Sequence, residues 1–157
     1  MRRGSFVAGL AAAFCLILGA AIPGAAQDRE GDGGTATRKP NLDLDYAQVR
    51  FVRASREISG AWSFAVTVRH RDEGWEHYAD AWQVVDPETG AVIAERVLAH
   101  PHENEQPFTR SLGGVRIPPE ISEVLVRARC NRHGFGGREI LVDLERSAGE
   151  GFEVSAR

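Results

Sequence analysis

The chain has very few residues that carry sulfur or a lysine amine. Its 157 residues include two cysteines, Cys15 and Cys130, one methionine, Met1, and one lysine, Lys39. Cys15 lies in an apolar segment that we expect to be removed on export, so Cys130 has no partner for a disulfide within the mature chain. The lack of a further methionine argues against a cuprous ion held by thioether sulfur. Cys130 is therefore a buried thiol, a metal-bound thiolate or a link to another chain.

Long apolar runs are also absent, apart from one near the N-terminus. Arg2 and Arg3 precede an apolar stretch from Phe6 to Ile22, which small residues follow. This pattern is typical of a cleavable export signal over residues 1–26, so we expect a periplasmic or secreted protein. The alternative, that this run stays uncleaved as a membrane anchor, is disfavoured because the run is short and interrupted by glycine. No stable membrane anchor is therefore expected after the signal is cleaved. Export by the Sec route or the twin-arginine route stays open.

Acidic residues slightly outnumber basic ones, 22 Asp and Glu against 19 Lys and Arg. The formal net charge is −3, and removal of the two signal arginines lowers it to −5. A surface of this sign disfavours nucleic acid and anionic membranes as partners. No glycine-rich phosphate loop stands before a helix, so no organic cofactor is predicted. The expected partners are a small molecule or a metal ion, or a protein of unknown kind.

No segment has the periodicity of a long helix. Residues 27–41 hold almost nothing apolar and predict a disordered tether. From about Leu42 onward, apolar and polar side chains alternate in seven short segments, which is typical of half-buried strands. The segments run from Tyr46 to Ser55, Trp62 to Arg69, His77 to Val84, Ala91 to Leu98, Pro107 to Leu112, Val124 to Cys130 and Glu139 to Glu145.

Seven short strands separated by turn residues about every ten positions predict an all-β domain. We expect an immunoglobulin-like antiparallel two-sheet sandwich over residues 42–146, with a small barrel as the alternative. Residues 147–157 are expected to form a loose C-terminal tail, although Phe152 and Val154 allow an added edge strand.

All five histidines fall in or beside the loops that follow the second, fourth and sixth predicted strands. In an alternating topology these loops lie at one end of the sandwich, where Cys130 also ends the sixth strand on its inward face. Imidazole and thiolate are ligands for iron, copper or zinc, so the pattern predicts a metal site for one of these ions. The candidate ligands are His70, His77, His100, His102, Cys130 and His133.

Other interpretations of these residues stay open. A single inward cysteine is often only a small core residue, and histidines in a charged loop are often solvated. A hydrolase pair of Cys130 and His133 is less favoured, because residues three positions apart in a tight turn suit a shared metal better. No catalytic residue is assigned.

Two motifs carry a family resemblance. The first is Cys130-Asn131-Arg132-His133-Gly134, and the second is His70 followed by His77-Tyr78-Ala79-Asp80-Ala81-Trp82. They resemble the Cys-Asn-x-His-Gly motif and the two-histidine segment of superoxide reductases, the desulfoferrodoxin and neelaredoxin family, whose domain is also an immunoglobulin-like sandwich. In that family four histidines and one cysteine hold a non-haem iron with one open position, where superoxide is reduced to peroxide. The resemblance implies that Cys130, His133, His70 and His77 are ligands.

The chain departs from that family in its remaining residues. An early Glu-Lys-His segment is missing, so a fifth ligand would come from His100 or His102. Arginines at positions 71, 132 or 138 would stand where the family uses lysine. The core also resembles a group of small exported bacterial proteins of no known function. Two classes of function follow: an oxidoreductase of the superoxide reductase type, and a non-catalytic module that binds metal or a partner protein.

Overall fold

A computed structural model of the chain describes residues 42–156, and the regular elements in that range are β-strands. The predicted signal peptide, residues 1–26, and the predicted tether, residues 27–41, lie outside the described residues. Within the described range, no helix is long and apolar enough to cross a membrane.

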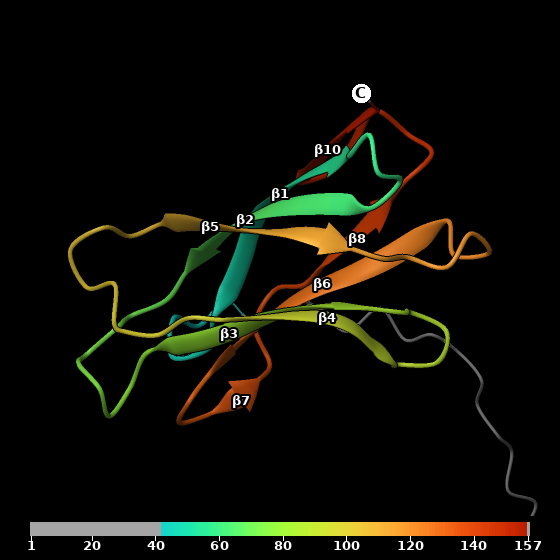
Figure 1. The fold of residues 1–157 in the computed structure, drawn as a ribbon. Coiled ribbons are helices and arrows are strands. Elements are labelled where there is room, and N and C mark those ends of the chain that lie inside the picture. Colours follow the sequence, from blue (N-terminus) through green and yellow to red (C-terminus); the bar gives the residue numbers. More distant parts are fainter. Residues whose placement is uncertain (1–41, 157) are drawn as a thin grey trace, which may run out of the picture. The chain divides into compact units, whose positions relative to one another are not determined.

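The strands form two sheets, seen as two layers in Figure 1. The first sheet has the order β5-β2-β1-β10-β9 and contains β1 (Gln48–Arg56), β2 (Trp62–Arg69), β5 (Phe108–Val115), β9 (Ala148–Gly149) and β10 (Phe152–Ala156). The second has the order β4-β3-β6-β7, with β8 also paired to β6, and contains β3 (Ala79–Val85), β4 (Val92–Val97), β6 (Glu123–Cys130), β7 (Gly134–Phe135) and β8 (Ile140–Asp143).

The connections between the strands are those of an immunoglobulin-like sandwich. The chain builds β1 and β2 in one sheet, crosses to the other for β3 and β4, returns for β5 and crosses again for β6. Paired strands are antiparallel except β1 and β10, which run parallel. The predicted all-β antiparallel two-sheet sandwich is therefore confirmed, and the two separate sheets exclude the small barrel.

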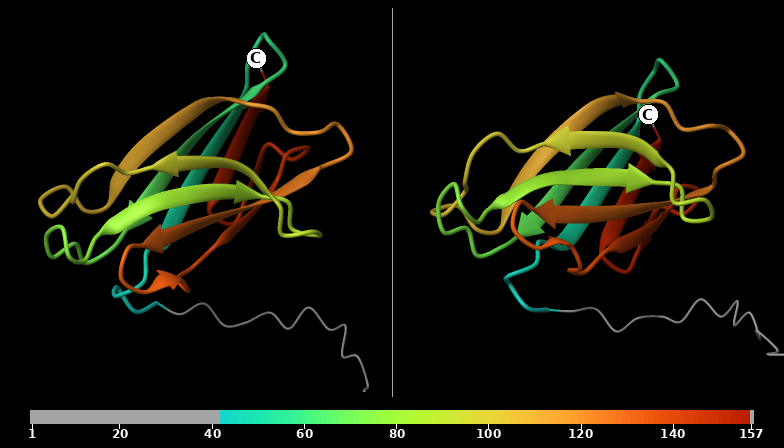
Figure 2. Two further views of the ribbon diagram at one scale, coloured as in Figure 1. Left: turned by 60° about the horizontal axis from the view of Figure 1, so that its bottom comes forward. Right: turned by 90° about the horizontal axis from the view of Figure 1, so that it is seen from below.

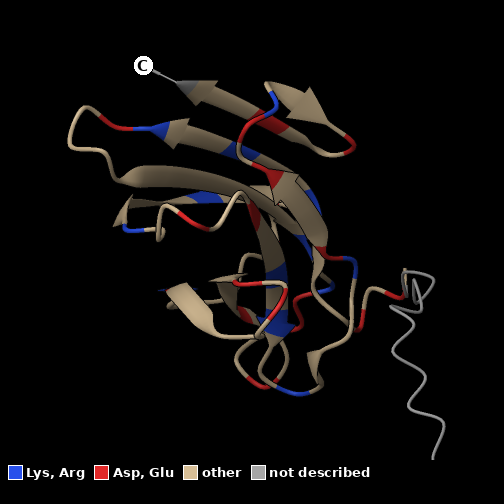
Figure 3. Ribbon diagram, turned by 90° about the vertical axis from the view of Figure 1, so that its right-hand side faces the viewer, with Lys and Arg blue, Asp and Glu red and all other residues tan. Residues whose placement is uncertain are grey.

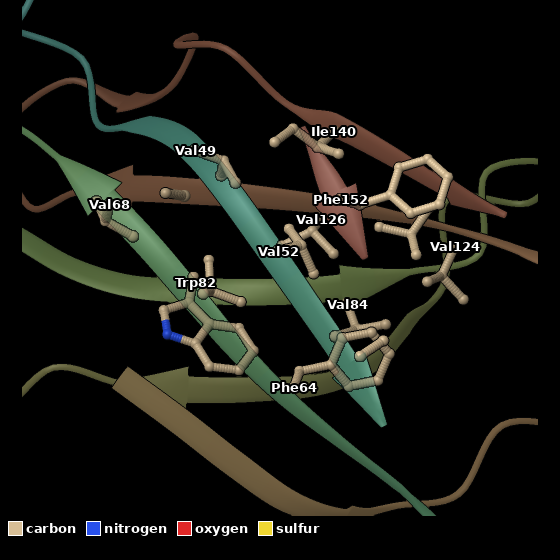
Figure 4. Packing of buried hydrophobic residues seen from close by; sticks show 14 of the residues in the cluster. Val49, Val52, Phe64, Val68, Trp82, Val84, Val124, Val126, Ile140 and Phe152 are labelled. Atoms are coloured by element: carbon tan, nitrogen blue, oxygen red, sulfur yellow. The ribbon is translucent and has the colours of Figure 1, made fainter. Parts of the chain in front are cut away.

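Alternate side chains of the strands fill the space between the two sheets. Phe64 and Val68 of β2 are fully buried, as are Trp82 of β3 and Val126 of β6. Figure 4 shows these side chains pointing between the layers. Burial of each large apolar side chain stabilises the fold by about 2 kcal/mol, so this core fixes the two sheets and the loop ends that they carry.

The C-terminal segment belongs to the sandwich, which corrects the expected loose tail after residue 146. Strand β10 pairs in parallel with β1, from Val52 opposite Phe152 to Arg56 opposite Ala156. The Phe152 side chain is only 6% exposed. The alternative of an added strand at Phe152 and Val154 is thus the one that the structure shows, although β10 lies between β1 and β9 and not at the edge. Its partner strand lies about a hundred positions earlier in the chain, so the local alternation does not indicate the pairing.

The loops after β2, β4 and β6 meet at one end of the sandwich (Figure 2). The backbone N–H of His102 donates a hydrogen bond to Asp72 Oδ2 at 2.6 Å, which joins the second loop to the first. The backbone N–H of Tyr78 donates to Asn131 Oδ1 at 3.0 Å, which joins the first loop to the third. The topology thus gathers the histidine-bearing loops, as the sequence predicts.

Candidate metal centre

Four of the six candidate ligands converge on the backbone carbonyl oxygen of Asp45. Nε2 of His70 lies 3.2 Å from this oxygen and Nε2 of His77 lies 3.4 Å from it. Sγ of Cys130 is 3.4 Å away and Nδ1 of His133 is 2.9 Å away. The ligand atoms of His70, His77 and Cys130 all lie within 4.8 Å of one another. Such spacing is that of side chains able to share one ion.

Strand β6 and the turn after it place the thiol and the fourth imidazole. Cys130 ends the strand and is 1% exposed. The backbone N–H of His133 donates to Sγ at 3.1 Å, and Nδ1 of the same residue lies 3.7 Å from Sγ. Gly134 then takes a φ of 70°, a conformation that glycine adopts without strain. This turn therefore holds the sulfur and the imidazole of His133 side by side, and a thiolate at this position could bind a metal.

A carboxylate orients each of the other two imidazoles. Nδ1 of His70 lies 2.6 Å from Asp72 Oδ1, and Nδ1 of His77 lies 3.2 Å from Glu73 Oε2. Because an ionised carboxylate only accepts hydrogen bonds, Nδ1 carries the proton in both rings. In the neutral ring this leaves a lone pair on Nε2, the atom that faces Asp45. Histidines that bind metals commonly have such a carboxylate partner.

Asp72 also ties the loops to one another. Its side chain is fully buried and accepts hydrogen bonds from His70 and from the backbone N–H groups of Ala79 and His102. Burial acts to raise the pKa of Asp72, but these hydrogen bonds outweigh it and hold the pKa below its usual value. The carboxylate is therefore ionised at neutral pH and fixes the orientation of His70.

His100 and His102 lie outside the converging group. The buried ring of His102 stacks on Phe108, with ring centroids 3.9 Å apart, and the exposed His100 lies against its other side at 4.5 Å. Within residues 42–156, Nδ1 of His102 has no hydrogen-bond partner. Burial, then the charge of Arg110, lowers the pKa of His102. The structure thus divides the six candidates into a converging four and a stacked pair.

The four residues of the centre differ in solvent exposure, and charged residues lie beside them. His133 is exposed, whereas His70, His77 and Cys130 are buried, so His133 is the member of the group that solvent reaches most easily. Arg71 pairs with Asp45 at 3.3 Å. Acidic and basic residues are otherwise interspersed along the ribbon, as Figure 3 shows.

Three residues of the centre, Asp45, Asp72 and Glu73, were not among the residues expected there from the sequence. Asp45 contributes a backbone oxygen, which every residue has, so its side chain carries no signal. Asp72 and Glu73 did offer one, since acids close to candidate histidines are natural partners for the second ring nitrogen. The hydrogen bond of His77 is the main cause of the lowered pKa of Glu73, and the charges of nearby arginines contribute.

Comparisons with known proteins add little chemistry. No family model matches the chain, and no solved structure matches it. The chain is 38% identical over 112 residues to a protein of Halomicrobium mukohataei named "Putative lipoprotein". The match covers 71% of this chain and 54% of that protein, so the chain spans about half the length of this relative.

Proposed function

We propose that the protein is an exported metal-binding protein. Its centre is formed by His70, His77, Cys130 and His133 and holds one transition-metal ion. The observation that carries this proposal is the convergence of three imidazole nitrogens and one thiol sulfur on a single carbonyl oxygen.

Hydrogen bonding alone accounts poorly for this arrangement. One carbonyl oxygen has two lone pairs and cannot serve four hydrogen-bond donors. If His70 and His77 are neutral, their Nε2 lone pairs face the lone pairs of the Asp45 oxygen, because Nδ1 holds the proton toward Asp72 and Glu73. A cation bound among these atoms would turn that repulsion into coordination.

The ligand types narrow the choice of metal. Imidazole and thiolate together suit iron, copper or zinc, and the scarcity of methionine disfavours a cuprous ion. We favour iron because the Cys130-to-Gly134 motif and the paired histidines resemble those of superoxide reductases. Iron held by these residues would supply one-electron chemistry, by which superoxide could take up one electron and two protons to give hydrogen peroxide.

The chain's own residues would prepare the site for that chemistry. Asp72 and Glu73 accept hydrogen bonds from Nδ1 of the two buried histidines and so turn Nε2 of each ring toward the centre. The N–H of His133 donates a hydrogen bond to Sγ of Cys130, and the exposed side chain of His133 would leave a small anion access to the ion. Arg71 lies beside the centre, where a positive charge would attract such an anion.

Export is supported by two independent features. Residues 1–26 have the pattern of a cleavable signal, and the similar protein of Halomicrobium mukohataei is named as a lipoprotein. A periplasmic or secreted location also fits a lone cysteine that a metal protects from oxidation.

Metal analysis of protein purified from its native compartment tests the proposal. We expect stoichiometric iron, with copper or zinc as the alternatives. Metal-free protein that also fails to take up any of the three would contradict it and favour a non-catalytic module with a protein partner. Iron-loaded protein that does not reduce superoxide would restrict the function to metal binding.

A further inference from the structure

We propose that the backbone carbonyl oxygen of Asp45 is itself a metal ligand, so that the centre has three nitrogens, one sulfur and one main-chain oxygen. This inference rests on the proposed function. The oxygen belongs to residues 42–47, which precede β1 and are named the N-terminal strap here.

The distances from this oxygen fit a ligand that is adjacent to all four others. Two metal bonds of about 2.1 Å at right angles place their ligand atoms about 3.0 Å apart. The Asp45 oxygen lies between 2.9 and 3.4 Å from the four ligand atoms. The Asp45 oxygen therefore lies close enough to all four side-chain atoms to share one ion with them.

Hydrogen bonds hold the N-terminal strap so that this oxygen stays aimed at the centre. The side-chain Nε2 of Gln48 donates to the carbonyl oxygens of Asp43, at 2.7 Å, and Tyr46, at 3.0 Å. The backbone N–H of Arg71 donates to the carbonyl of Leu44 at 3.0 Å. The carbonyls on both sides of Asp45 thus have partners in the protein, while that of Asp45 faces the four ligand atoms.

Two glycines let the N-terminal strap lie directly against the loop that carries the thiol. A Cβ atom on Gly137 would overlap the carbonyl oxygen of Ala47, and one on Gly136 would lie 2.6 Å from Cδ1 of Tyr46. The Tyr46 ring also contacts His133, with ring centroids 5.6 Å apart. The glycine pair after His133 therefore serves to bring the strap oxygen and the side-chain ligands together.

A main-chain ligand also explains why the converging group needs no fifth side chain. His100 and His102 were the candidates for that place, but they stack against each other and Phe108 instead. Carbonyl oxygen is an accepted ligand of hard and borderline cations, so iron(II) or zinc can use it, whereas a cuprous ion prefers sulfur.

The direct test is a crystal structure of the full mature chain loaded anaerobically with iron(II). We expect the Asp45 oxygen within bonding distance of the ion, about 2.2 Å. An oxygen that has moved away while the ion stays on the imidazoles and the thiolate overturns this inference and leaves the proposed function intact. Failure to bind iron(II), copper or zinc contradicts both.

A matched pair of variants tests the role of the strap in solution. Gln48→Leu removes the two hydrogen bonds from the Gln48 side chain to the strap, and the one that this side chain accepts from the Arg138 N–H, but it changes no ligand. The bond from Arg71 to Leu44 remains, and we expect about tenfold weaker iron(II) binding in competition with a chelator. Gln83→Leu is the control, because Gln83 is also buried but bonds Glu95 and Arg127 away from the strap. Equal affinities of folded Gln48→Leu protein and wild type would count against a strap-held ligand.

Discussion

The turn between β3 and β4 and the histidine-bearing loops differ in how far along the chain their stabilising contacts reach. At the end without histidines, the turn between β3 and β4 is held from within, since Asp86 accepts hydrogen bonds from the Thr89 hydroxyl at 2.6 Å and the Glu88 N–H at 2.9 Å. At the histidine end, contacts join residues far apart, such as His133 Nδ1 and the Asp45 oxygen, 88 positions away.

This difference separates loops that only turn the chain from loops that build a site. A turn with local partners needs nothing from the rest of the molecule. The loops at the histidine end depend on one another, because Asp72 bonds two of them and the N-terminal strap contacts the third. Substitutions at that end should therefore affect several loops at once.

Asp72→Ala should have the largest effect on stability. It leaves the buried N–H groups of Ala79 and His102 and Nδ1 of His70 without an acceptor, which should cost about 3 kcal/mol in the free energy of unfolding. Urea unfolding of metal-free protein measures the loss. The control is Asp86→Ala in the exposed local turn, for which we expect a smaller loss. Equal losses would contradict the contrast between the two ends.

Cys130→Ser should abolish the thiolate-to-metal charge-transfer band while leaving the fold intact. Serine is nearly isosteric with cysteine, so the β6 face that carries Val124 and Val126 is kept. In wild-type protein loaded with ferric iron or cupric copper we expect a thiolate-to-metal charge-transfer band, which the variant should lack. The wild-type thiol should resist alkylation until a chelator is added. Resistance that chelation does not change would indicate a merely buried thiol.

Two exposed histidines, His133 and His100, lie at the histidine end, but only His133 belongs to the converging group. His133→Ala removes a ligand atom that lies 2.9 Å from the shared oxygen, and we expect at least tenfold weaker metal binding. His100→Ala removes a ring outside the converging group and should leave the affinity unchanged. Chelator competition measures both. Loss of binding in His100→Ala would show that the stacked pair belongs to the centre.

The smallest effect is expected at the local turn. The Thr89 hydroxyl, then the Glu88 N–H, holds the pKa of Asp86 below its usual value. Because the folded pKa is lower than the unfolded one, the stability that it contributes is present above the unfolded pKa, 3.8, and is lost as the pH falls through the folded value. Thr89→Val should raise the pKa of Asp86 in a carboxyl NMR titration. An unchanged pKa would mean that the hydroxyl bond is not formed.

The sequence by itself determined the main strands and the end at which the histidines gather. Alternation in segments such as Trp62–Arg69 and Glu123–Cys130 is local, because each second side chain must be buried for a strand to pack. The alternating order of the strands then places the loops after β2, β4 and β6 together. The inward position of Cys130 follows from the same period.

Only the tertiary structure decided which histidines converge and what they face. The separation of His133 from the stacked pair His100 and His102 depends on how three loops pack, and no residue pattern encodes it. The pairing of β10 with β1 likewise joins segments from opposite parts of the chain. The Asp45 oxygen is a main-chain atom that every residue possesses, so its place among the ligand atoms arises solely from the path of the folded backbone.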